Sequence, residues 1–330
     1  MMNWRDKNVL VTGAGGFIGS HLVEGLHRTG ARVTAFVKYN SRGDWGMVDD
    51  IDPAIKNDIT VLSGDITDGK TMRASLDGID LVYHLAALNG IPYSYEAPES
   101  YIHTNIIGTH RVLEACMHAG VERLIQTSTS EVYGTAQYVP IDEKHPLCGQ
   151  SPYSASKIAA DKIAESYYHA FSLPVTIIRP FNVYGPRQSA RAIIPTVISQ
   201  ALAGNVVKIG SRSPVRDLTY VDDTIRGFIK MGENDDALGK TINIGSGKGI
   251  TIGDLSQKIV DLINPDASII SEECRIRPES SEVMALICDN RMADEVLSWK
   301  PEVDLSTGLS KTITWVRDNM TRFKTETYAV

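Results

Sequence analysis

The sequence predicts an α/β protein with a doubly wound parallel sheet, followed by a second, smaller α/β lobe. In the first half of the 330 residues, short β-branched runs alternate with helix-like stretches. This alternation is typical of βαβ units, whose crossover helices cover both faces of a parallel sheet. A glycine-rich turn follows the first run. After Pro180 the alternation loosens and prolines punctuate the chain, which indicates the second lobe.

The composition is that of an ordinary globular protein. Hydrophobic residues make up 42% and charged residues 22%, which excludes disordered, collagen-like and coiled-coil chains. The net charge of −7 argues against nucleic acid or a membrane surface as the partner. The four cysteines show no metal-ligand spacing, so we expect no metal and a reduced, cytoplasmic protein. We expect neither a signal peptide nor a membrane span.

The expected elements follow in order along the chain. Strands are expected at 9–12, 31–37, 59–62, 80–85, 123–128 and 174–179. Helices are expected at 17–29, 68–77, 99–119 and 152–171, and later at 190–203, 252–263 and 305–317, with strands at 206–209 and 241–244. Residues 1–179 plus about 215–247 should form the larger lobe, and about 180–214 plus 248–330 the smaller one.

The turn after the first strand carries three glycines in the spacing GxxGxxG. Gly13 allows a sharp turn, Gly16 lets backbone amides approach a pyrophosphate, and Gly19 lets the following helix pack close to the sheet. The N-terminus of that helix adds partial positive charge. A glycine-rich turn also occurs in other α/β proteins, but this position between a strand and a helix favours dinucleotide binding.

The segment after the second strand has no acidic residue before Asp44 to hold the adenosine ribose. Lys38, Ser41 and Arg42 instead offer two cations and a hydroxyl where a 2′-phosphate would lie. The sequence therefore favours NADP over NAD, with a solvated basic loop as the alternative. Asp65, after the third strand, is a candidate for the adenine amino group or an ordinary turn aspartate.

A tyrosine and a lysine share one face of the helix expected to begin at Pro152. Ser151 is its predicted N-cap, and Tyr153 and Lys157 are four residues apart. A tyrosine with a pKa of about 10 is a poor base at neutral pH. A nearby ammonium group and an oxidised nicotinamide ring would favour its phenolate form, which could remove a hydroxyl proton as a hydride leaves the same carbon.

Six segments together resemble the landmarks of extended short-chain dehydrogenases/reductases of the nucleotide-sugar epimerase/dehydratase family. In chain order they are GAGGFIG (13–19), HLAA (84–87), STSEVYG (128–134), YSASK (153–157), RPFNVYGPR (179–187) and RDLTYVDD (216–223). The resemblance implies a Rossmann-like lobe with a tightly bound, recycled nicotinamide cofactor and a smaller nucleotide-sugar lobe. It also implies a homodimer formed through a four-helix interface by the helices that begin near Glu99 and Pro152.

The resemblance also extends the expected cofactor site. The added residues are Phe17, Ile18, Ile66, Leu85, Ala86 and Ala87.

The residues that close the fifth strand distinguish the reactions known in this family. An epimerase needs only reversible oxidation at C4 of the sugar, whereas a 4,6-dehydratase also needs a base for the C5 proton. Glu131 is the candidate base, Ser130 or Glu131 can assist loss of the C6 hydroxyl, and Thr129 can hydrogen-bond the C4 oxygen. The Thr-Ser-Glu form resembles GDP-mannose 4,6-dehydratases, whereas dTDP-glucose dehydratases carry aspartate at the position of Ser130.

The favoured function is therefore a nucleotide-sugar 4,6-dehydratase that forms a 4-keto-6-deoxy sugar. The segments 88–95 and 130–147 most resemble dehydratases that act on nucleotide-linked N-acetylglucosamine in legionaminic-acid-type pathways, so GDP- or UDP-N-acetylglucosamine is the favoured substrate. UDP-glucuronate decarboxylase and 4-epimerase are the alternative enzymes. A non-catalytic module that senses sugar nucleotides or NADP(H) is the alternative outside catalysis.

Five polar residues of the second half are candidates for holding the nucleotide sugar. Asn182 resembles the family asparagine that hydrogen-bonds the diphosphate. Arg187, Arg216 and Arg277 are candidate clamps for the diphosphate or the sugar, since a guanidinium group can donate two parallel hydrogen bonds to phosphate. Arg216 is the strongest of the three, and Arg191 lies where a helix beside the nucleotide should begin.

Overall fold

The computed structural model describes residues 2–325, and its larger lobe contains the predicted doubly wound parallel sheet. The sheet has seven strands in the order β11-β6-β5-β4-β1-β2-β3, and every neighbouring pair is parallel. The strands are β1 (Asn8–Thr12), β2 (Arg32–Lys38), β3 (Thr60–Gly64), β4 (Leu81–His84), β5 (Arg123–Thr127), β6 (Val175–Pro180) and β11 (Thr241–Ile244). The predicted Rossmann-like fold class is confirmed.

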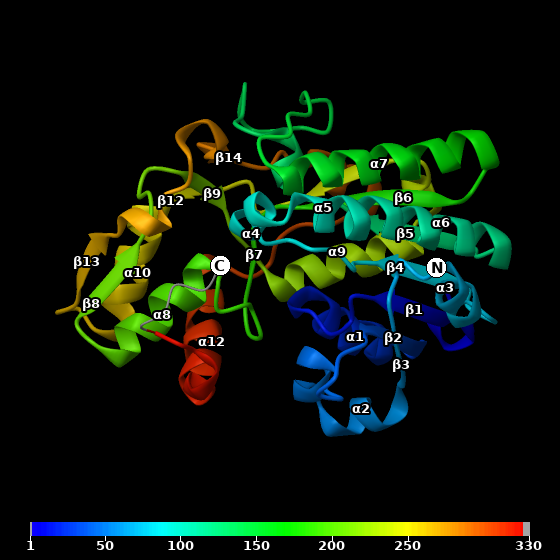
Figure 1. The fold of residues 1–330 in the computed structure, drawn as a ribbon, viewed down its shortest axis with the longest axis horizontal. Helices are drawn as coiled ribbons and strands as arrows, with labels where there is room; N and C mark the ends of the chain where they lie inside the picture. The colour runs from blue at the N-terminus through cyan, green and yellow to red at the C-terminus, as the bar shows by residue number, and fades with distance from the viewer. Residues whose placement is uncertain (1, 326–330) are drawn as a thin grey trace.

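Helices cover both faces of this sheet (Figure 1). One face packs against α1 (Phe17–Thr29) and α9 (Val221–Glu233), which also contact each other. The other face packs against α3 (Gly69–Ser75), α6 (Gly108–Ala119) and α7 (Pro152–Phe171). Alternate residues of β1 enter opposite cores, as a sheet buried on both faces requires.

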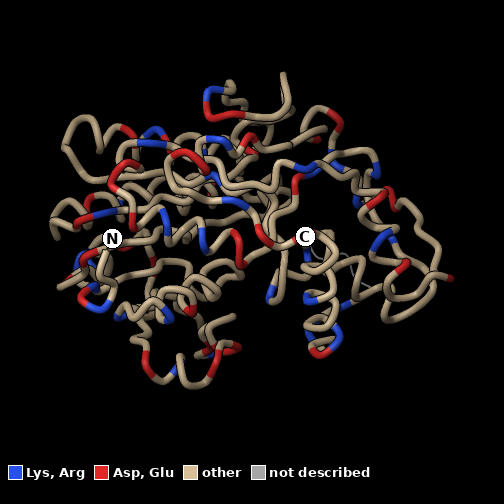
Figure 2. Tube along the Cα trace, turned by 180° about the vertical axis from the view of Figure 1, so that it is seen from behind, with Lys and Arg blue, Asp and Glu red and all other residues tan. Residues whose placement is uncertain are grey.

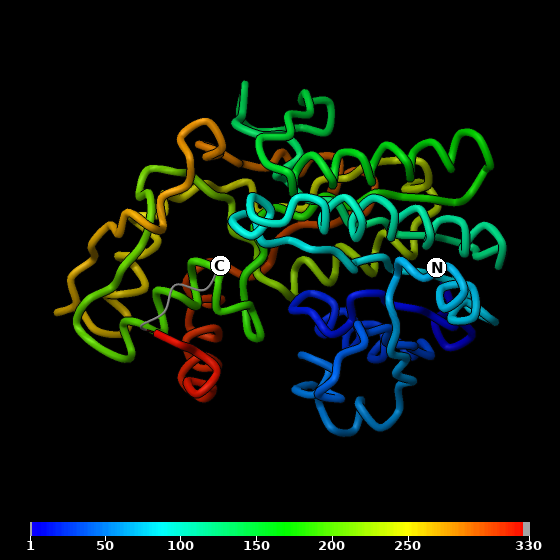
Figure 3. The backbone as a smooth tube through the Cα atoms, viewed as in Figure 1, coloured from blue at the N-terminus to red at the C-terminus, as the bar shows by residue number. Residues whose placement is uncertain are grey.

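The smaller lobe lies at the carboxyl ends of the strands and consists of short sheets and three helices (Figure 1). The helices are α8 (Ile193–Ala203), α10 (Ile252–Ile263) and α12 (Leu305–Asp318). The strands are β8 (Val206–Ile209) paired with β13 (Ser268–Ser271), and β9 (Val215–Asp217) paired with β12 (Gly249–Thr251) and β14 (Ala285–Leu286). Figure 3 shows the red α12 beside α8, on the side of the smaller lobe that faces the larger lobe.

Further short elements complete the two lobes. They are η2 (Gly46–Asp50), α2 (Pro53–Asp58), α4 (Ile91–Glu96), α5 (Pro98–Tyr101), η3 (Ile102–Ile107), η4 (Ser130–Tyr133), β7 (Val183–Tyr184), β10 (Thr219–Tyr220), α11 (Arg291–Leu297) and η8 (Met320–Arg322). The expected helix at 99–119 is therefore divided into α5, a π-helical turn η3 and α6.

The structure differs from the expected lobe boundaries at two places. The expected return to the larger lobe at about 215 falls at the start of β9, which pairs with β12 and β14 of the smaller lobe. The following helix α9 packs on the large sheet, and α11, within the range expected for the smaller lobe, packs against α9 and β11. Neither α9 nor α11 is among the helices expected from the sequence.

Charged residues of both signs are distributed over the whole molecule. Figure 2 shows acidic and basic residues interspersed along the trace of both lobes. Within residues 2–325, no helix combines the length and the apolar character that crossing a bilayer requires.

Candidate active site

A cavity of about 970 Å³ lies where the carboxyl ends of the parallel strands face the smaller lobe. Its wall in the larger lobe comes from the turns after β1, β2, β3, β4 and β5, and from α7. Its wall in the smaller lobe comes from the segment after β6, from α8, from the end of β8 and from the 275–277 loop. This is the edge where open α/β sheets bind their ligands.

The glycine turn after β1 forms a backbone cradle at one end of the cavity. Gly13 has φ +70°, and a β-carbon there would lie 2.7 Å from the amide nitrogen of Ala86. A β-carbon on Gly19 would overlap the carbonyl oxygen of Gly13, so this position also requires glycine. Gly16 is the N-cap of α1 and offers no side chain to the helix N-terminus, whose amides stay available for phosphate.

The remaining residues predicted for the cofactor line the cavity, with two exceptions. Those that line it are Gly13, Gly16, Phe17, Ile18, Gly19, Lys38, Asp65, Ile66, Leu85, Ala86 and Ala87. Their backbone-rich cradle and the free end of α1 fit a dinucleotide.

Ser41 and Arg42 are the exceptions and correct the expectation based on the β2 segment. Neither lines the cavity, and Nε of Arg42 lies 2.9 Å from Oδ2 of Asp44, so that cation is paired with a carboxylate. Asp44 itself lines the cavity, and its side chain is held by the amide of Asn40. The basic pair inferred from the sequence is therefore reduced to Lys38, and the carboxylate of Asp44 lines the same cavity.

Asp65 is oriented by its own turn. Its Oδ1 accepts hydrogen bonds from the backbone amide and the hydroxyl of Thr67, at 2.9 and 2.8 Å. Burial opposes ionisation, but these two bonds, together with the charges of Lys38 and His103, hold the pKa of the Asp65 carboxyl below its usual range. Asp65 is therefore an ionised acceptor at the cavity wall.

His84 supports the floor of the cofactor end from below. Its Nδ1 lies 2.7 Å from Oγ1 of Thr12, and its Nε2 lies 3.1 Å from Oγ1 of Thr109. Burial, reinforced by the charge of Lys157, lowers the pKa of His84 to about 3. The imidazole is neutral at ordinary pH and links β1 and β4 to α6 rather than acting in proton transfer.

The predicted tyrosine–lysine helix begins as the sequence indicates. Ser151 and Ser154 form a capping box, and α7 then presents Tyr153 and Lys157 to the cavity. Nζ of Lys157 donates a hydrogen bond of 2.6 Å to the carbonyl oxygen of Thr127 at the end of β5. Burial raises the pKa of Tyr153, a hydrogen bond with Thr129 opposes this shift, and Glu131 adds to it.

The turn that closes β5 brings three predicted residues to the same wall. Thr129, Ser130 and Glu131 line the cavity together with Tyr153 and Lys157. The backbone amide of Glu131 donates to Oγ1 of Thr129 at 3.2 Å, which fixes the start of η4. Only 9% of Glu131 is exposed, so its carboxylate faces the cavity rather than open solvent. Hydroxyl, phenol, ammonium and carboxylate groups thus converge on one region.

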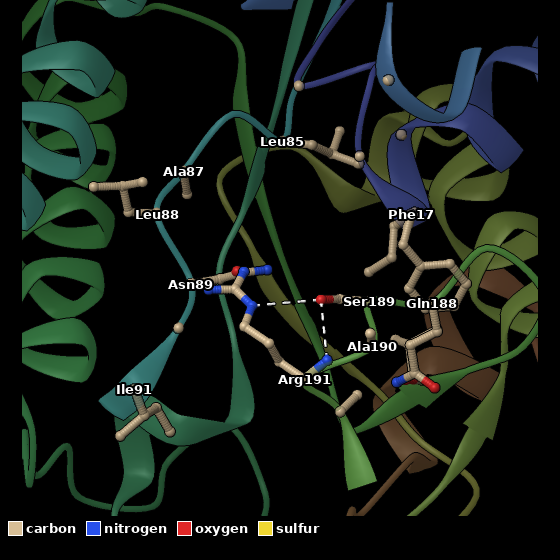
Figure 4. A pocket seen from close by; sticks show the side chains of 18 of the residues that line it. Phe17, Leu85, Ala87, Leu88, Asn89, Ile91, Gln188, Ser189, Ala190 and Arg191 are labelled. Carbon is tan, nitrogen blue, oxygen red and sulfur yellow. Dashed lines mark hydrogen bonds between the residues drawn. The ribbon is translucent and has the colours of Figure 1, made fainter. Parts of the chain in front are cut away.

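Three residues predicted for the substrate lie on the smaller-lobe side of the cavity. Asn182, Arg191 and Arg277 line it. Oδ1 of Asn182 is buried and has no hydrogen-bond partner among residues 2–325, so it is an acceptor that a ligand can satisfy. Figure 4 shows Arg191 extending from the Ser189 turn toward Asn89 on the opposite wall. At the base of this side chain, the backbone N and Nε of Arg191 both lie 3.4 Å from Oγ of Ser189.

Arg187 does not reach the cavity, which corrects the expectation that it clamps the ligand. Its guanidinium group forms a buried ion pair with Glu24 of α1 and also contacts His21. Burial, together with the charge of Arg187, lowers the pKa of His21 to about 4. Arg187 therefore joins the two lobes instead of binding phosphate.

Arg216 lies one layer behind the cavity wall. Its Nη1 donates to the carbonyl oxygen of Val283 at 2.8 Å, and its Nη2 lies 3.3 Å from Glu282. Glu282 also pairs with Arg277 at 3.5 Å, so the two arginines share one carboxylate. Glu131 is close enough to act electrostatically on Arg216. Arg216 therefore does not line the cavity, and its contact with a ligand stays a prediction.

Several lining residues were missed from the sequence. Lys208 and Arg275 line the far end of the cavity, and Lys208 lies 2.8 Å from Glu272. The pairing of β8 with β13 brings these distant segments together, and no local pattern reveals it. Residues 322–325 line the mouth on the cofactor side, where Arg322 forms a two-pronged ion pair with Asp50 of η2.

Known proteins resemble the chain along nearly its whole length. The family described as GDP-mannose 4,6 dehydratase matches residues 10–312. A dTDP-glucose 4,6-dehydratase of Streptomyces antibioticus is 34% identical over 320 residues, which cover 94% of this chain and 93% of that protein. A UDP-glucose 4-epimerase of Mycolicibacterium smegmatis is 33% identical over 322 residues, which cover 94% of this chain and 98% of the relative.

The fold is also similar to that of solved structures. The dTDP-glucose 4,6-dehydratase DesIV of Streptomyces venezuelae, with NAD and TYD bound, superimposes with a TM-score of 0.85 at 28% identity. The match covers 96% of this chain and 99% of that structure.

Proposed function

The chain belongs to the GDP-mannose 4,6-dehydratase family of extended short-chain dehydrogenases/reductases, and we propose that it is a nucleotide-sugar 4,6-dehydratase. The reaction removes water from C5 and C6 of the sugar and leaves a ketone at C4. The cradle at Gly13, Gly16 and Gly19 would hold an oxidised nicotinamide cofactor, which would supply the acceptor for a hydride from C4 and the donor of that hydride to C6. The protein must therefore move protons at three atoms of the sugar. It takes one from the C4 oxygen, gives one to the departing C6 oxygen, and takes one from C5 that is replaced when the hydride adds at C6.

Tyr153 is the base for the C4 hydroxyl. In the protein alone burial raises its pKa, so the phenolate requires nearby positive charge. Lys157, on the same helix face, supplies an ammonium group, and its bond to the Thr127 carbonyl holds it in place. Thr129, beside the Tyr153 hydroxyl, orients the same oxygen.

The observation that carries the proposal is the position of Glu131. Its carboxylate is nearly buried at the end of β5 and faces the cavity that Tyr153 and Lys157 also line. Once C4 is a ketone, the C5 proton is acidic, and a carboxylate can remove it as the C6 oxygen leaves as water. Glu131 or Ser130 donates the proton that the departing hydroxyl needs.

Two other reactions remain rivals within the same family. A 4-epimerase uses Tyr153 and Lys157 but has no step for Glu131, and a UDP-glucuronate decarboxylase loses the C6 carboxylate as carbon dioxide. The match to a 4-epimerase is nearly as strong as that to a dehydratase, so product mass must decide between them. A module that only senses sugar nucleotides would bind them without turnover.

For the substrate, we propose GDP- or UDP-N-acetylglucosamine, on the likeness of the 88–95 and 130–147 segments to dehydratases of such sugars. Asn182, Arg191 and Arg277 would hold its diphosphate and sugar, since they supply an open acceptor and two guanidinium groups to the cavity wall.

For the cofactor, the placement of Asp44 favours NAD over the NADP that the sequence favours. The carboxylate at the wall would repel a 2′-phosphate, and Arg42 is already paired.

The homodimer remains a proposal that rests on the exposed apolar residues of the expected interface helices. Ile102, Ile107, Met117 and Phe171 are exposed on η3, α6 and α7. Lysine in place of Ile102 should convert a dimer into a monomer in sedimentation equilibrium.

The test is mass spectrometry of the purified enzyme with GDP- and UDP-N-acetylglucosamine, GDP-mannose and UDP-glucuronate, each alone. Loss of one water from any of the first three supports the dehydratase and names its substrate. Loss of carbon dioxide from the fourth would establish the decarboxylase instead. An isomer of unchanged mass would establish the epimerase.

Two variants assign the steps. Glu131→Gln should keep nucleotide-sugar binding and lower the rate of water loss about 10²–10⁴-fold, because the C5 base is removed. Tyr153→Phe should block even the first oxidation, seen as missing absorbance of reduced nicotinamide in a single turnover. An undiminished rate in either variant would remove that residue from the mechanism.

A further inference from the structure

A fully buried carboxylate lies directly behind the catalytic wall. Asp161 follows Lys157 by one turn of α7 and does not line the cavity. Its Oδ2 accepts a hydrogen bond of 2.6 Å from Oγ of Ser128. The same oxygen accepts Nε and Nη2 of Arg179 of β6, at 3.2 and 3.0 Å. Three elements therefore meet on one carboxylate oxygen.

These contacts join the two segments that carry the proposed chemistry. Ser128 immediately precedes the Thr129–Glu131 turn, and its backbone amide donates to Ile178 of β6 at 2.8 Å. Its side chain is held by Asp161 of the helix that carries Tyr153 and Lys157. The bond from Lys157 to the Thr127 carbonyl is a second link between the same two segments. Loss of the Asp161 link would let the turn move relative to the helix.

Hydrogen bonds satisfy Arg179 but only one of the two carboxylate oxygens of Asp161. Nη1 of Arg179 donates to the hydroxyl of Tyr133 at 3.0 Å, and that hydroxyl donates to Asn243 at 2.8 Å. Oδ1 of Asp161 is buried and has no hydrogen-bond partner among residues 2–325. The negative charge of Asp161 therefore also acts on Lys157, since buried charges are weakly screened.

We propose, on the basis of the proposed function, that Asp161 is a positioning residue for the Tyr153–Lys157 pair. It holds the Ser128–Glu131 turn against α7, and it stabilises the ammonium form of Lys157 in a site where burial disfavours charge. Arg179 limits this effect by neutralising part of the carboxylate charge.

The pKa shifts of Lys157 and Tyr153 predict the direction of the effect of Asp161. Burial lowers the pKa of Lys157, and Asp161 opposes that shift. Burial raises the pKa of Tyr153, and Asp161 adds to that shift. Removing the Asp161 charge should therefore lower both pKa values.

The other titratable groups near Tyr153 and Lys157 do not change the direction of these pKa shifts. His84 of β4 acts on Lys157 but is neutral, whereas Glu131 of η4 and the buried Tyr101 of α5 act on Tyr153. The substitutions at Asp161, Ser128 and Arg179 leave these groups in place.

The first experiment compares kcat as a function of pH for the wild type, Asp161→Asn and Ser128→Ala. In Asp161→Asn, the acid limb set by Tyr153 and the alkaline limb set by Lys157 should both move to lower pH, by about one unit. Ser128→Ala removes the positioning bond but keeps the charge, so it should lower kcat about tenfold without moving either limb. A folded Asp161→Asn enzyme with unmoved limbs would overturn the proposal.

A second variant, expected to shift the pH limbs in the opposite direction, keeps the test decisive if Asp161→Asn does not fold. Arg179→Gln can keep a donor to Asp161 near the position of Nε while removing the positive charge, so both limbs should move to higher pH. If Asp161 and Arg179 had only structural roles, both variants would be less stable, but their pH limbs would not move in opposite directions. Limbs that stay in place in Arg179→Gln would contradict the proposal independently.

A second readout does not depend on turnover. The ¹³C signal of Lys157 Cε in lysine-labelled protein, assigned by its loss in Lys157→Met, reports the ammonium-to-amine transition directly. Its midpoint should fall in Asp161→Asn, rise in Arg179→Gln and stay in Ser128→Ala. If the wild type turns over no nucleotide sugar, the proposed function fails, while this titration still decides the role of Asp161.

Discussion

The two ends of the cavity are built in different ways. At the cofactor end, the wall is mostly main chain: a glycine turn, the open N-terminus of α1 and the 85–87 segment after β4. At the substrate end, long cationic side chains project from segments of the smaller lobe, among them Arg191, Lys208 and Arg277. A backbone wall accepts one shape of ligand, whereas a wall of flexible side chains can be altered residue by residue. Affinity for the cofactor should therefore depend on backbone geometry, and affinity for the substrate on individual charges.

The sharpest test of the backbone end is Gly13→Ala. A β-carbon at φ +70° would lie 2.7 Å from the amide nitrogen of Ala86, so either the turn or the 85–87 floor must shift. We expect the cofactor Kd to rise about 100-fold, or about 2.7 kcal/mol. Calorimetric titration of cofactor-stripped protein measures it.

Gly78→Ala is the matched control for this prediction. Gly78 has φ +69° but open space around its missing β-carbon, and it lies away from the cavity. It should lower the melting temperature slightly and leave the cofactor Kd unchanged. Equal losses of affinity in the two variants would show that backbone strain, rather than the close approach to Ala86, is what matters.

At the substrate end, Arg277→Gln removes one charge from the wall. We expect the Kd of the nucleotide sugar to rise about tenfold, because one charge-assisted contact with phosphate is lost, while the cofactor Kd stays the same. Titration with the nucleoside diphosphate alone measures this effect. Arg212→Gln, an exposed arginine of the same lobe outside the cavity wall, should change neither value. If Arg277→Gln changed both Kd values, the two ends of the cavity would not bind their ligands independently.

The smallest expected effect tests whether a side chain also contributes at the backbone end. Asp44→Ser removes the carboxylate that lines the cavity and frees Arg42 from its pair. The ratio of NAD to NADP affinity should fall about fivefold, since the repulsion of a 2′-phosphate is relieved. Arg28→Ser, an exposed site on α1 outside the cavity wall, is the control. An unchanged ratio would place cofactor choice elsewhere on the wall.

The contrast between the two ends also explains how far the sequence could predict the site. The turn at Gly13 and the face shared by Tyr153 and Lys157 depend on local geometry, so spacing along the chain was enough to predict both. Glu131 could be predicted because the carboxyl ends of parallel strands share one edge. These features need no knowledge of distant partners.

The errors concern side chains whose partners come from elsewhere in the fold. Arg187 follows a family motif, but Glu24 and His21 of α1 hold it away from the cavity. Arg42 was counted as a free cation, although Asp44 two residues later pairs with it. The contribution of Lys208 depends on the pairing of β8 with β13, which joins segments about 60 residues apart. A long charged side chain can reach several partners, and only tertiary packing selects one.

The shared hydrophobic core limits how far the two lobes can be exchanged between related proteins. One continuous cluster runs from Val9 of β1 and Leu22 of α1 through Ile225 of α9 to Ile198 of α8 and Leu309 of α12, so the two lobes share their interior. A chimaera that took its smaller lobe whole from a relative would have to match side-chain shapes across this buried seam, or leave cavities in both halves. New substrate preferences are therefore more accessible through exchanges at the cavity wall, where loops carry the recognition groups, than through recombination of lobes.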